Sequence, residues 1–276
     1  MGPGRIIRGG CVWLILLTGL ASAREIGPGD LDRLPQVDVV VLGEVHDNPD
    51  HHAHQARAVA VVQPAALVFE MILPEQVRAL PSDRGDGVAM ARALDWAARG
   101  WPDFAMYHPI FSAAPRARIY GADVPQAALV RAMEAGAAAA FGMGAARFGL
   151  TEPLPQPEQA ARERALWAAH CFALPQEAMA GMVEAQRLRD AALARAVLRA
   201  MAETGGPVAV ITGTEHARRD RGVPALLVRA APEVTVLALG QIEGPAEADP
   251  PFDLWITTDA PEGRGDPCAA FGSIEG

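Results

Sequence analysis

The chain has 276 residues, of which 50% are hydrophobic and 5% aromatic, and it carries a formal net charge of −9 at pH 7. These values are typical of one large globular domain, or two small ones, with a substantial core, and they suit a folded protein better than a disordered chain. The acidic balance argues against nucleic-acid and anionic-membrane partners, because both require a basic surface. The sequence contains no lysine, which excludes Schiff-base chemistry and a P-loop lysine.

Residues 1–23 have the form of a secretory signal peptide. Arg5 and Arg8 precede an apolar run over 12–20, and the sequence A-S-A that ends at Ala23 resembles a cleavage site. The apolar run is too short to cross a bilayer, which takes about 20 residues. We therefore expect cleavage near Ala23 and a periplasmic or secreted protein, whose net charge changes from −9 to −11 because two arginines and no acids are lost.

Residues 24–36 are rich in glycine and proline and are predicted to be a linker. The rest of the chain, 37–276, is predicted to form a single α/β domain. Short apolar runs that end at turn residues or acids are typical of buried parallel strands. Strands are predicted at 37–42, 66–71, 118–122, 207–212, 234–239 and 252–257.

Helical segments alternate with these strands. Asp50 is the predicted N-cap of the first helix, and Gly100 and Gly205 are predicted helix ends. The alternation predicts a mainly parallel sheet flanked by helices, with an additional helical subdomain or lid within residues 81–200. Helices are predicted at 50–62, from Pro74 onward, and at 88–99, 125–135, 158–172, 176–203 and 222–230.

Acids and histidines follow three of the predicted strands. Glu44 and His46 lie two residues apart and share a face in extended chain, Glu70 ends the second strand, and His216 follows the fourth. Because the carboxyl ends of parallel strands meet at one edge of a sheet, we expect these four side chains in one crevice. They suit either a divalent transition metal or a metal-free acid/base site. A purely structural role, as helix caps or partners of nearby arginines, is the alternative.

Two polar residues interrupt the apolar stripe of the predicted helix 176–203. Gln186 and Asp190 lie on the same face as its apolar residues. A buried polar side chain needs a partner. Either this face is exposed at that point, or both residues face the same pocket as Glu44.

Three histidines follow closely on the crevice residues. His51 and His54 share a helical face, while His52 points elsewhere. A solvated first turn is the simpler interpretation, and weak binding of a metal or cofactor is the alternative. After signal-peptide cleavage two cysteines remain, Cys171 and Cys268, and the sequence leaves open whether they form a disulfide.

Four segments together resemble a known family. They are L-G-E-V-H-D-N-P-D-H-H-A-H-Q at 42–55, F-E-M at 69–71, Q-R-L-R-D at 186–190 and T-G-T-E-H-A-R-R-D-R-G-V-P at 212–224. They resemble the ChaN-type haem-binding uptake proteins, whose superfamily also holds Tiki/TraB-like proteases and erythromycin esterases. One position departs from the family pattern, because Glu215 stands where a small residue usually precedes the distal histidine.

The resemblance implies an exported haem-binding protein that serves iron uptake, with membrane haem-uptake components as partners and a homodimer that shares haem. A haem site needs an apolar slot, an axial ligand and cations for the propionates. Tyr107 in the aromatic segment 101–111 is the preferred ligand, although it could instead be a packing residue, and Tyr120 lies in a predicted strand. The predicted haem-contacting residues are Tyr107, His108, His46, His216, Gln186 and Asp190.

The superfamily also implies an alternative function. In a hydrolase, Glu44, His46, Glu70 and His216 would form the catalytic site. One carboxylate would activate water, while a metal or an imidazole polarised the scissile carbonyl.

Overall fold

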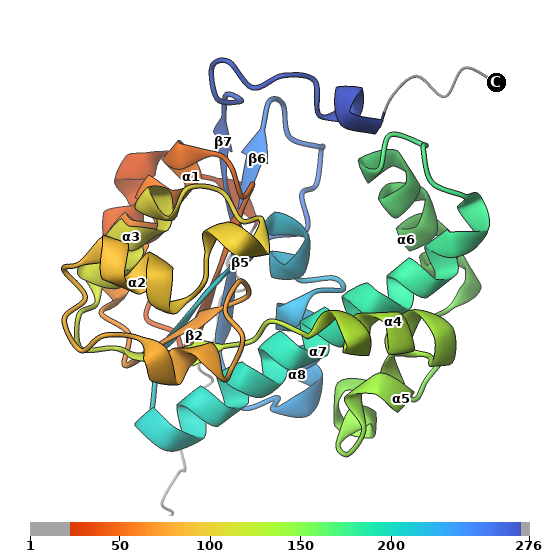
Figure 1. The fold of residues 1–276 in the computed structure, drawn as a ribbon, viewed down its shortest axis with the longest axis horizontal. Helices are drawn as coiled ribbons and strands as arrows, with labels where there is room; N and C mark the ends of the chain where they lie inside the picture. Colours follow the sequence, from red (N-terminus) through yellow and green to blue (C-terminus); the bar gives the residue numbers. More distant parts are fainter. Residues whose placement is uncertain (1–22, 272–276) are drawn as a thin grey trace, which may run out of the picture.

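A computed structural model describes residues 23–271 of the chain, and its centre is a seven-stranded sheet in which every paired strand is parallel (Figure 1). The order across the sheet is β1-β7-β6-β2-β5-β3-β4. The predicted architecture, a mainly parallel sheet flanked by helices, is confirmed. The strands are β1 Arg24–Glu25, β2 Val39–Glu44, β3 Ala66–Phe69, β4 Arg118–Gly121, β5 Val208–Gly213, β6 Val236–Glu243 and β7 Leu254–Thr258.

Residues 24–36 are part of the domain and do not form the predicted linker. Arg24 and Glu25 pair with β7 as an edge strand, and a 3-10 helix, η1, follows at Pro28–Arg33. Ile26 and Leu31 are buried in the core. Two apolar side chains in a Gly/Pro-rich segment are too few to reveal this packing in the sequence. The predicted signal peptide, apart from Ala23, lies outside the described residues.

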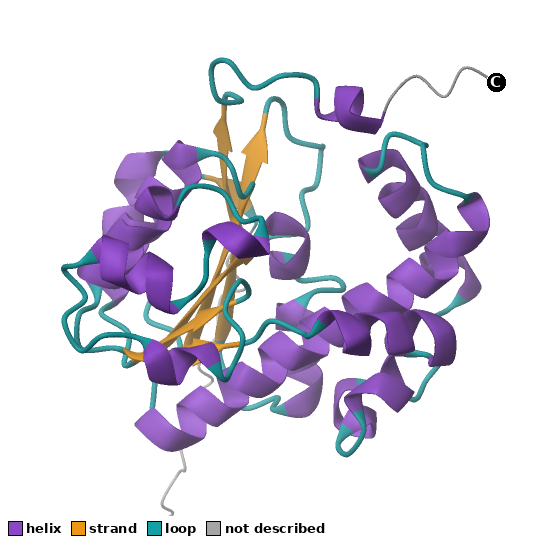
Figure 2. Cartoon of the chain, in the orientation of Figure 1, coloured by secondary structure: helices purple, strands orange, loops and turns teal. Residues whose placement is uncertain are grey.

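Helices account for most of the remaining chain (Figure 2). Helix α1 begins one residue earlier than predicted, because its N-cap is Asn48, whose side chain accepts a hydrogen bond from the Asp50 amide. The helix predicted from Pro74 is only a short 3-10 turn, η2, at Gln76–Ala79. The α-helices are α1 Pro49–Val62, α2 Gly87–Ala93, α3 Phe104–Ala113, α4 Gln126–Ala135, α5 Ala137–Phe141, α6 Gln156–Ala169, α7 Met179–Thr204 and α8 Val223–Ala230.

The sheet separates two hydrophobic cores. Val40 and Leu42 of β2 face the core that α1 and α3 cover, whereas Val39 and Val41 face the core that α4, α7 and α8 cover. This alternation along one strand explains why all six residues of β2 are buried and why the strand reads as a continuous apolar run.

Helix α6 stands apart from the sheet and packs against α7 (Figure 1). It contributes no fully buried residue. A disulfide between Cys171, just beyond α6, and Cys268, in the 3-10 helix η7 at Pro267–Phe271, ties this end of α6 to the C-terminal segment. The helical excursion therefore carries a lid-like helix that is fixed at one end. Within residues 23–271, no helix has the length and apolarity needed to span a bilayer.

Candidate functional site

Three strand ends meet at the carboxyl edge of the sheet. Glu44 is the last residue of β2 and pairs in register with Gly213, the last residue of β5. Glu70 directly follows β3, and His216 lies in the 3-10 helix η6 (Thr214–Ala217) that follows β5. Gly43 permits this arrangement, since a Cβ there would lie 2.9 Å from the Thr214 Cα. The structure therefore brings the four predicted site residues together.

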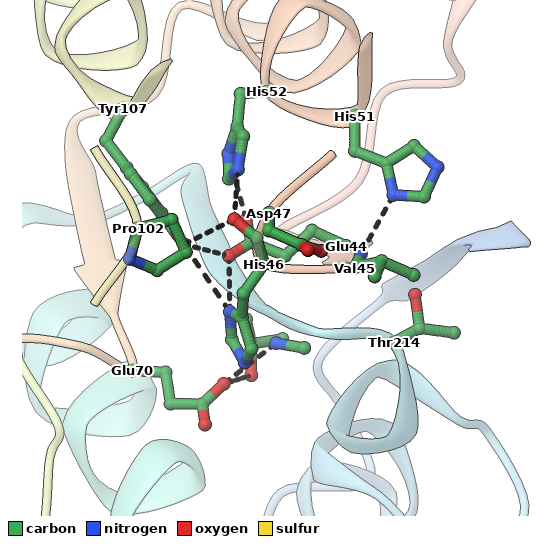
Figure 3. Close-up of polar contacts among 12 residues, drawn as sticks. Glu44, Val45, His46, Asp47, His51, His52, Glu70, Pro102, Tyr107 and Thr214 are labelled. Carbon is green, nitrogen blue, oxygen red and sulfur yellow. Dashed lines mark hydrogen bonds and ion pairs between the residues drawn. The ribbon is translucent and has the colours of Figure 1, made fainter. Parts of the chain in front are cut away.

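Glu44 is the centre of one half of the site (Figure 3). Its side chain is buried, and Oε1 accepts a hydrogen bond of 2.8 Å from the Tyr107 hydroxyl. The same oxygen lies 2.8 Å from Nδ1 of His46, and Oε2 lies 3.4 Å from Nδ1 of His52. Tyr107 and His46 thus hold Oε1 in place by hydrogen bonds, and charge-assisted hydrogen bonds of this kind are stronger than neutral ones.

The histidines at the start of α1 are structural. His51 and His52 are fully buried, so the expectation of a solvated first turn is wrong for both. The Val45 amide donates to Nδ1 of His51, and Nε2 of His52 lies 2.8 Å from the His46 carbonyl oxygen. Burial lowers the pKa of His51 to about 4, so it is neutral at pH 7. These two imidazoles fix the turn that carries His46, and His54 bonds to Gln241 instead.

Glu70 is the centre of the second half. Its Oε2 accepts hydrogen bonds from the Thr212 hydroxyl and the Gly213 amide, at 2.7 and 2.8 Å. Its Oε1 lies 3.4 Å from Nε2 of His216, whose Nδ1 lies 2.7 Å from Asp190 of α7. His216 is thus held between two carboxylates. Asp190 thus reaches the site through its contact with His216.

Neighbouring opposite charges shift the pKa values of His216, Glu70 and His46 more than burial does. Burial lowers the pKa of His216, but the neighbouring Glu70 and Asp190 raise it by a larger amount. The net result is a pKa of about 10. Burial would raise the pKa of Glu70, yet the neighbouring His216 and His46 hold it well below its usual range. Burial also opposes the charge of His46, whose pKa is nonetheless raised by Glu44 and Glu70. At neutral pH the second half is therefore an ion pair, with His216 as the cation.

A cavity of about 930 Å³ opens above both halves. This volume lies at the upper end of the range for small-molecule sites, roughly 300–1,000 Å³. Trp101 and Phe252 supply apolar surface, and Gln186 and Arg189 line it from α7. The cavity is lined at its base by Glu44, His46, Glu70, Gly213 and His216.

Three polar atoms of residues that line this cavity are buried without a hydrogen-bond partner among residues 23–271. They are Oε2 of Glu44, Oε1 of Gln186 and Nε1 of Trp101. Buried polar groups are usually satisfied. A ligand in the cavity with both donor and acceptor groups would be able to satisfy them. This places Gln186 at the predicted pocket, whereas Asp190 bonds to His216 and is not among the residues that line the cavity.

Two predicted haem contacts lie elsewhere. His108 belongs to α3, and its Nε2 lies 2.7 Å from the Arg84 carbonyl oxygen, outside the cavity lining. Tyr107 is 0% exposed. Burial, followed by the adjacent Glu44, raises its pKa far above the usual value, which disfavours the phenolate that an iron ligand requires.

The residues also bear on the metal alternative. Across residues 23–271, no group of three or more His, Cys, Asp or Glu side chains is arranged to hold a metal ion. Glu44, His46, Glu70 and His216 instead bond within two separate clusters. A metal site built from these four residues is therefore not supported.

Sequence reasoning missed three contributors to the site. Thr212 fixes Glu70, Arg189 supplies a cation to the cavity, and Trp101 packs edge-on against the His46 ring with centroids 5.0 Å apart. The aromatic segment 101–111 is conspicuous in the sequence, but no residue spacing connects Trp101 to His46. For Arg189, its place between Gln186 and Asp190 was the available signal.

Comparison with known proteins agrees with the geometry. The family model described as haem-binding uptake, Tiki superfamily, ChaN matches residues 31–227. Among solved structures, ChaN of Campylobacter jejuni, with cofacially bound haem, superposes with a TM-score of 0.62 at 15% identity, covering 82% of this chain and 89% of that one. The type III effector HopBA1 gives a TM-score of 0.46 at 12% identity, covering 84% and 91%. No curated protein matches the chain. The family match covers more than half of the sequence, and the chain belongs to the ChaN family of haem-binding uptake proteins in the Tiki superfamily.

Proposed function

We propose that this chain binds haem in the cavity at the carboxyl edge of the sheet. The observation that carries the proposal is the cavity itself, which combines about 930 Å³ of space with apolar walls and an imidazole at its base. Family membership supports haem as the ligand, since the matching family is described as haem-binding.

The residues present fit the needs of haem. Trp101, Ile242 and Phe252 offer apolar surface to a macrocycle, together with three prolines at 245, 250 and 251. His46 offers an imidazole, which is an established axial ligand for haem iron.

Arg189 is the cation best placed for a propionate. Its side chain is 27% exposed, and its contact with Asp123 is a distant one of 3.5 Å. Arg218 also lines the cavity, but its guanidinium is held by Asp220 through two hydrogen bonds of 3.0 and 2.8 Å. Arg189 therefore loses fewer existing contacts than Arg218 when it binds a propionate.

Titration of the purified mature chain with hemin tests this function. We expect saturable binding with a shifted Soret band and a fixed stoichiometry. A Soret band that stays at the position of free hemin throughout the titration would contradict the proposal.

We further propose that the protein is exported and serves haem or iron uptake. The features of residues 1–23 support export, and the Cys171–Cys268 disulfide is of the kind that persists in oxidising compartments. Fractionation of cells that express the full chain tests this part, with N-terminal sequencing expected to begin at Arg24. Recovery of the protein in the cytoplasm with its N-terminus intact would contradict it.

A homodimer that shares haem and a contact with membrane uptake components are also proposed. The cofacial haem of the Campylobacter jejuni ChaN structure supports the dimer by likeness of fold. Sedimentation with and without hemin tests it, and we expect the dimer to increase with hemin. An unchanged monomer at saturating hemin would contradict a shared site.

One observation favours a metal-free hydrolase as a second function. Glu44 bonds to Nδ1 of His46 and leaves Nε2 facing the cavity, as in a general base that is oriented by a carboxylate. In that case Nε2 of His46 would take a proton from water as the water attacks a carbonyl. Ester or peptide turnover that is lost in Glu44→Gln would support this function, and the absence of turnover across both substrate classes would count against it.

A further inference from the structure

We propose that His46, through Nε2, is the axial iron ligand in this chain, and that Glu44 is the residue that positions it. This inference rests on the proposed haem function and names the ligand of the same cavity.

The two tyrosines of the chain are both engaged elsewhere. The hydroxyl of Tyr107 donates to the buried carboxylate of Glu44 and has no exposed surface. The hydroxyl of Tyr120 donates to Glu203 at 3.0 Å, at the far end of α7 from the cavity. A tyrosinate ligand would therefore require a buried hydrogen bond to break and a proton to leave from beside a carboxylate.

Two histidines line the cavity in the described part of the chain, and they differ in availability. Both ring nitrogens of His216 face carboxylates, and its side chain is only 9% exposed. The side chain of His46 is 34% exposed, and its Nε2 has no hydrogen-bond partner among residues 23–271. A ligand that enters the cavity can therefore reach Nε2 of His46 without breaking an existing contact.

The surroundings of His46 fix the direction of its ring. Oε1 of Glu44 accepts a hydrogen bond of 2.8 Å from Nδ1, so the lone pair of the neutral ring is on Nε2. Trp101 packs edge-on against the ring at 62° between planes. Gly213 leaves room beside it, since a Cβ there would lie 3.2 Å from Nε2. A histidine whose second nitrogen bonds to a carboxylate is the usual arrangement of metal-ligating histidines.

Glu44 is itself positioned by two further groups. The Tyr107 hydroxyl bonds to Oε1, and His52 lies 3.4 Å from Oε2. The buried Tyr107 thus belongs to the support of the ligand. The same network explains why His51 and His52 are buried, since they fix the turn that carries His46.

The test compares ferric hemin complexes of the wild type, His46→Ala and His108→Ala. His108 is the matched control, because it is half-buried and bonds to Arg84 outside the cavity. We expect the Soret and EPR spectra to change in His46→Ala only, with weaker hemin binding. Added imidazole should restore the wild-type spectrum in His46→Ala, which a general loss of folding would not allow.

Glu44→Gln provides a second, independent readout. A neutral amide is a weaker acceptor for the Nδ1 proton, so the ring becomes a weaker donor to iron. Resonance Raman spectra of the ferrous complex should then show a lower iron–histidine stretching frequency, and hemin affinity should fall by about tenfold or more.

The outcomes distinguish an error in the ligand assignment from an error in the proposed haem function. If the wild type and His46→Ala bind hemin with identical spectra, haem binding stands and His46 is not the ligand. If the wild type binds no hemin, the proposed function itself fails, and the ligand assignment fails with it.

Discussion

The Tyr107 hydroxyl donates a 2.8 Å hydrogen bond to Oε1 of Glu44, although the two residues lie 63 positions apart in the chain. This contact joins α3 to the end of β2 and buries both groups. It favours the packing role of Tyr107 over the iron-ligand role, which are the two alternatives that the sequence left open.

Removal of this hydroxyl should cost stability, while the chain should still bind ferric hemin. Tyr107→Phe leaves the buried Glu44 short of one donor, and we expect the free energy of unfolding to fall by about 1–3 kcal/mol. Urea denaturation measures the change. Tyr120→Phe is the control, because its partner Glu203 is 30% exposed and water can replace the lost bond. Loss of the ferric haem spectrum in Tyr107→Phe would contradict this role.

His51 should make the fold sensitive to acid. Its folded pKa is about 4 against 6.5 for an ordinary histidine, so the unfolded state binds more protons between these two values. The stability that the neutral ring contributes is therefore complete above pH 6.5 and is lost as pH falls toward 4, by up to about 3 kcal/mol.

Denaturation of His51→Asn across this pH range checks the prediction. Asparagine keeps an acceptor for the Val45 amide but does not titrate, so the variant should lose less stability on acidification than the wild type. Parallel pH curves for the wild type and His51→Asn would exclude His51 as the cause.

The Cys171–Cys268 disulfide should stabilise the lid-like helix α6 more than the rest of the fold. The double variant Cys171→Ser/Cys268→Ser removes the cross-link and lets the unfolded chain adopt more conformations. Disulfides typically add about 2–4 kcal/mol to the free energy of unfolding. We expect faster hydrogen exchange in α6 and little change in the central part of α7, which is buried against the sheet. Equal protection of α6 in both proteins would show that the disulfide does not hold it.

Arg189 should contribute to hemin affinity through a propionate. Arg189→Gln removes a charge-assisted hydrogen bond of about 1.5–3 kcal/mol, which corresponds to roughly tenfold or more in the dissociation constant. Arg199→Gln is the control on the same helix, because Arg199 is 63% exposed and bonds to Glu203 away from the cavity. Equal hemin affinities for the two variants would remove Arg189 from the site.

The sequence predicted the strands of the sheet closely where they are buried on both faces. β2 and β5 read as continuous β-branched runs because two cores cover them. The edge strand β1 has only two residues and carries no periodicity, so nothing in the sequence distinguishes its segment from a linker. Helix α3 was not predicted, because Pro109 interrupts a helical pattern and its aromatic residues are equally typical of a packed loop.

The site could be predicted in part for a similar reason. Glu44, His46, Glu70 and His216 follow strands whose parallel order brings their ends together, so their convergence could be expected. The hydrogen-bond partners of these four residues could not be predicted. The contacts of Tyr107 with Glu44 and of Asp190 with His216 depend on how α3 and α7 pack against the sheet. Local sequence contains no measure of that packing.

Hemin titration of Gly213→Val against the wild type tests the site of haem binding most directly. Gly213 has φ −59° and ψ 147°, which any residue adopts, and a side chain there would lie beside His46 and Glu70. We expect Gly213→Val to fold and to lose most hemin binding, while Gly29→Val, in open space on η1, keeps it. A Gly213→Val variant that binds hemin with wild-type affinity and spectrum would place haem outside this cavity.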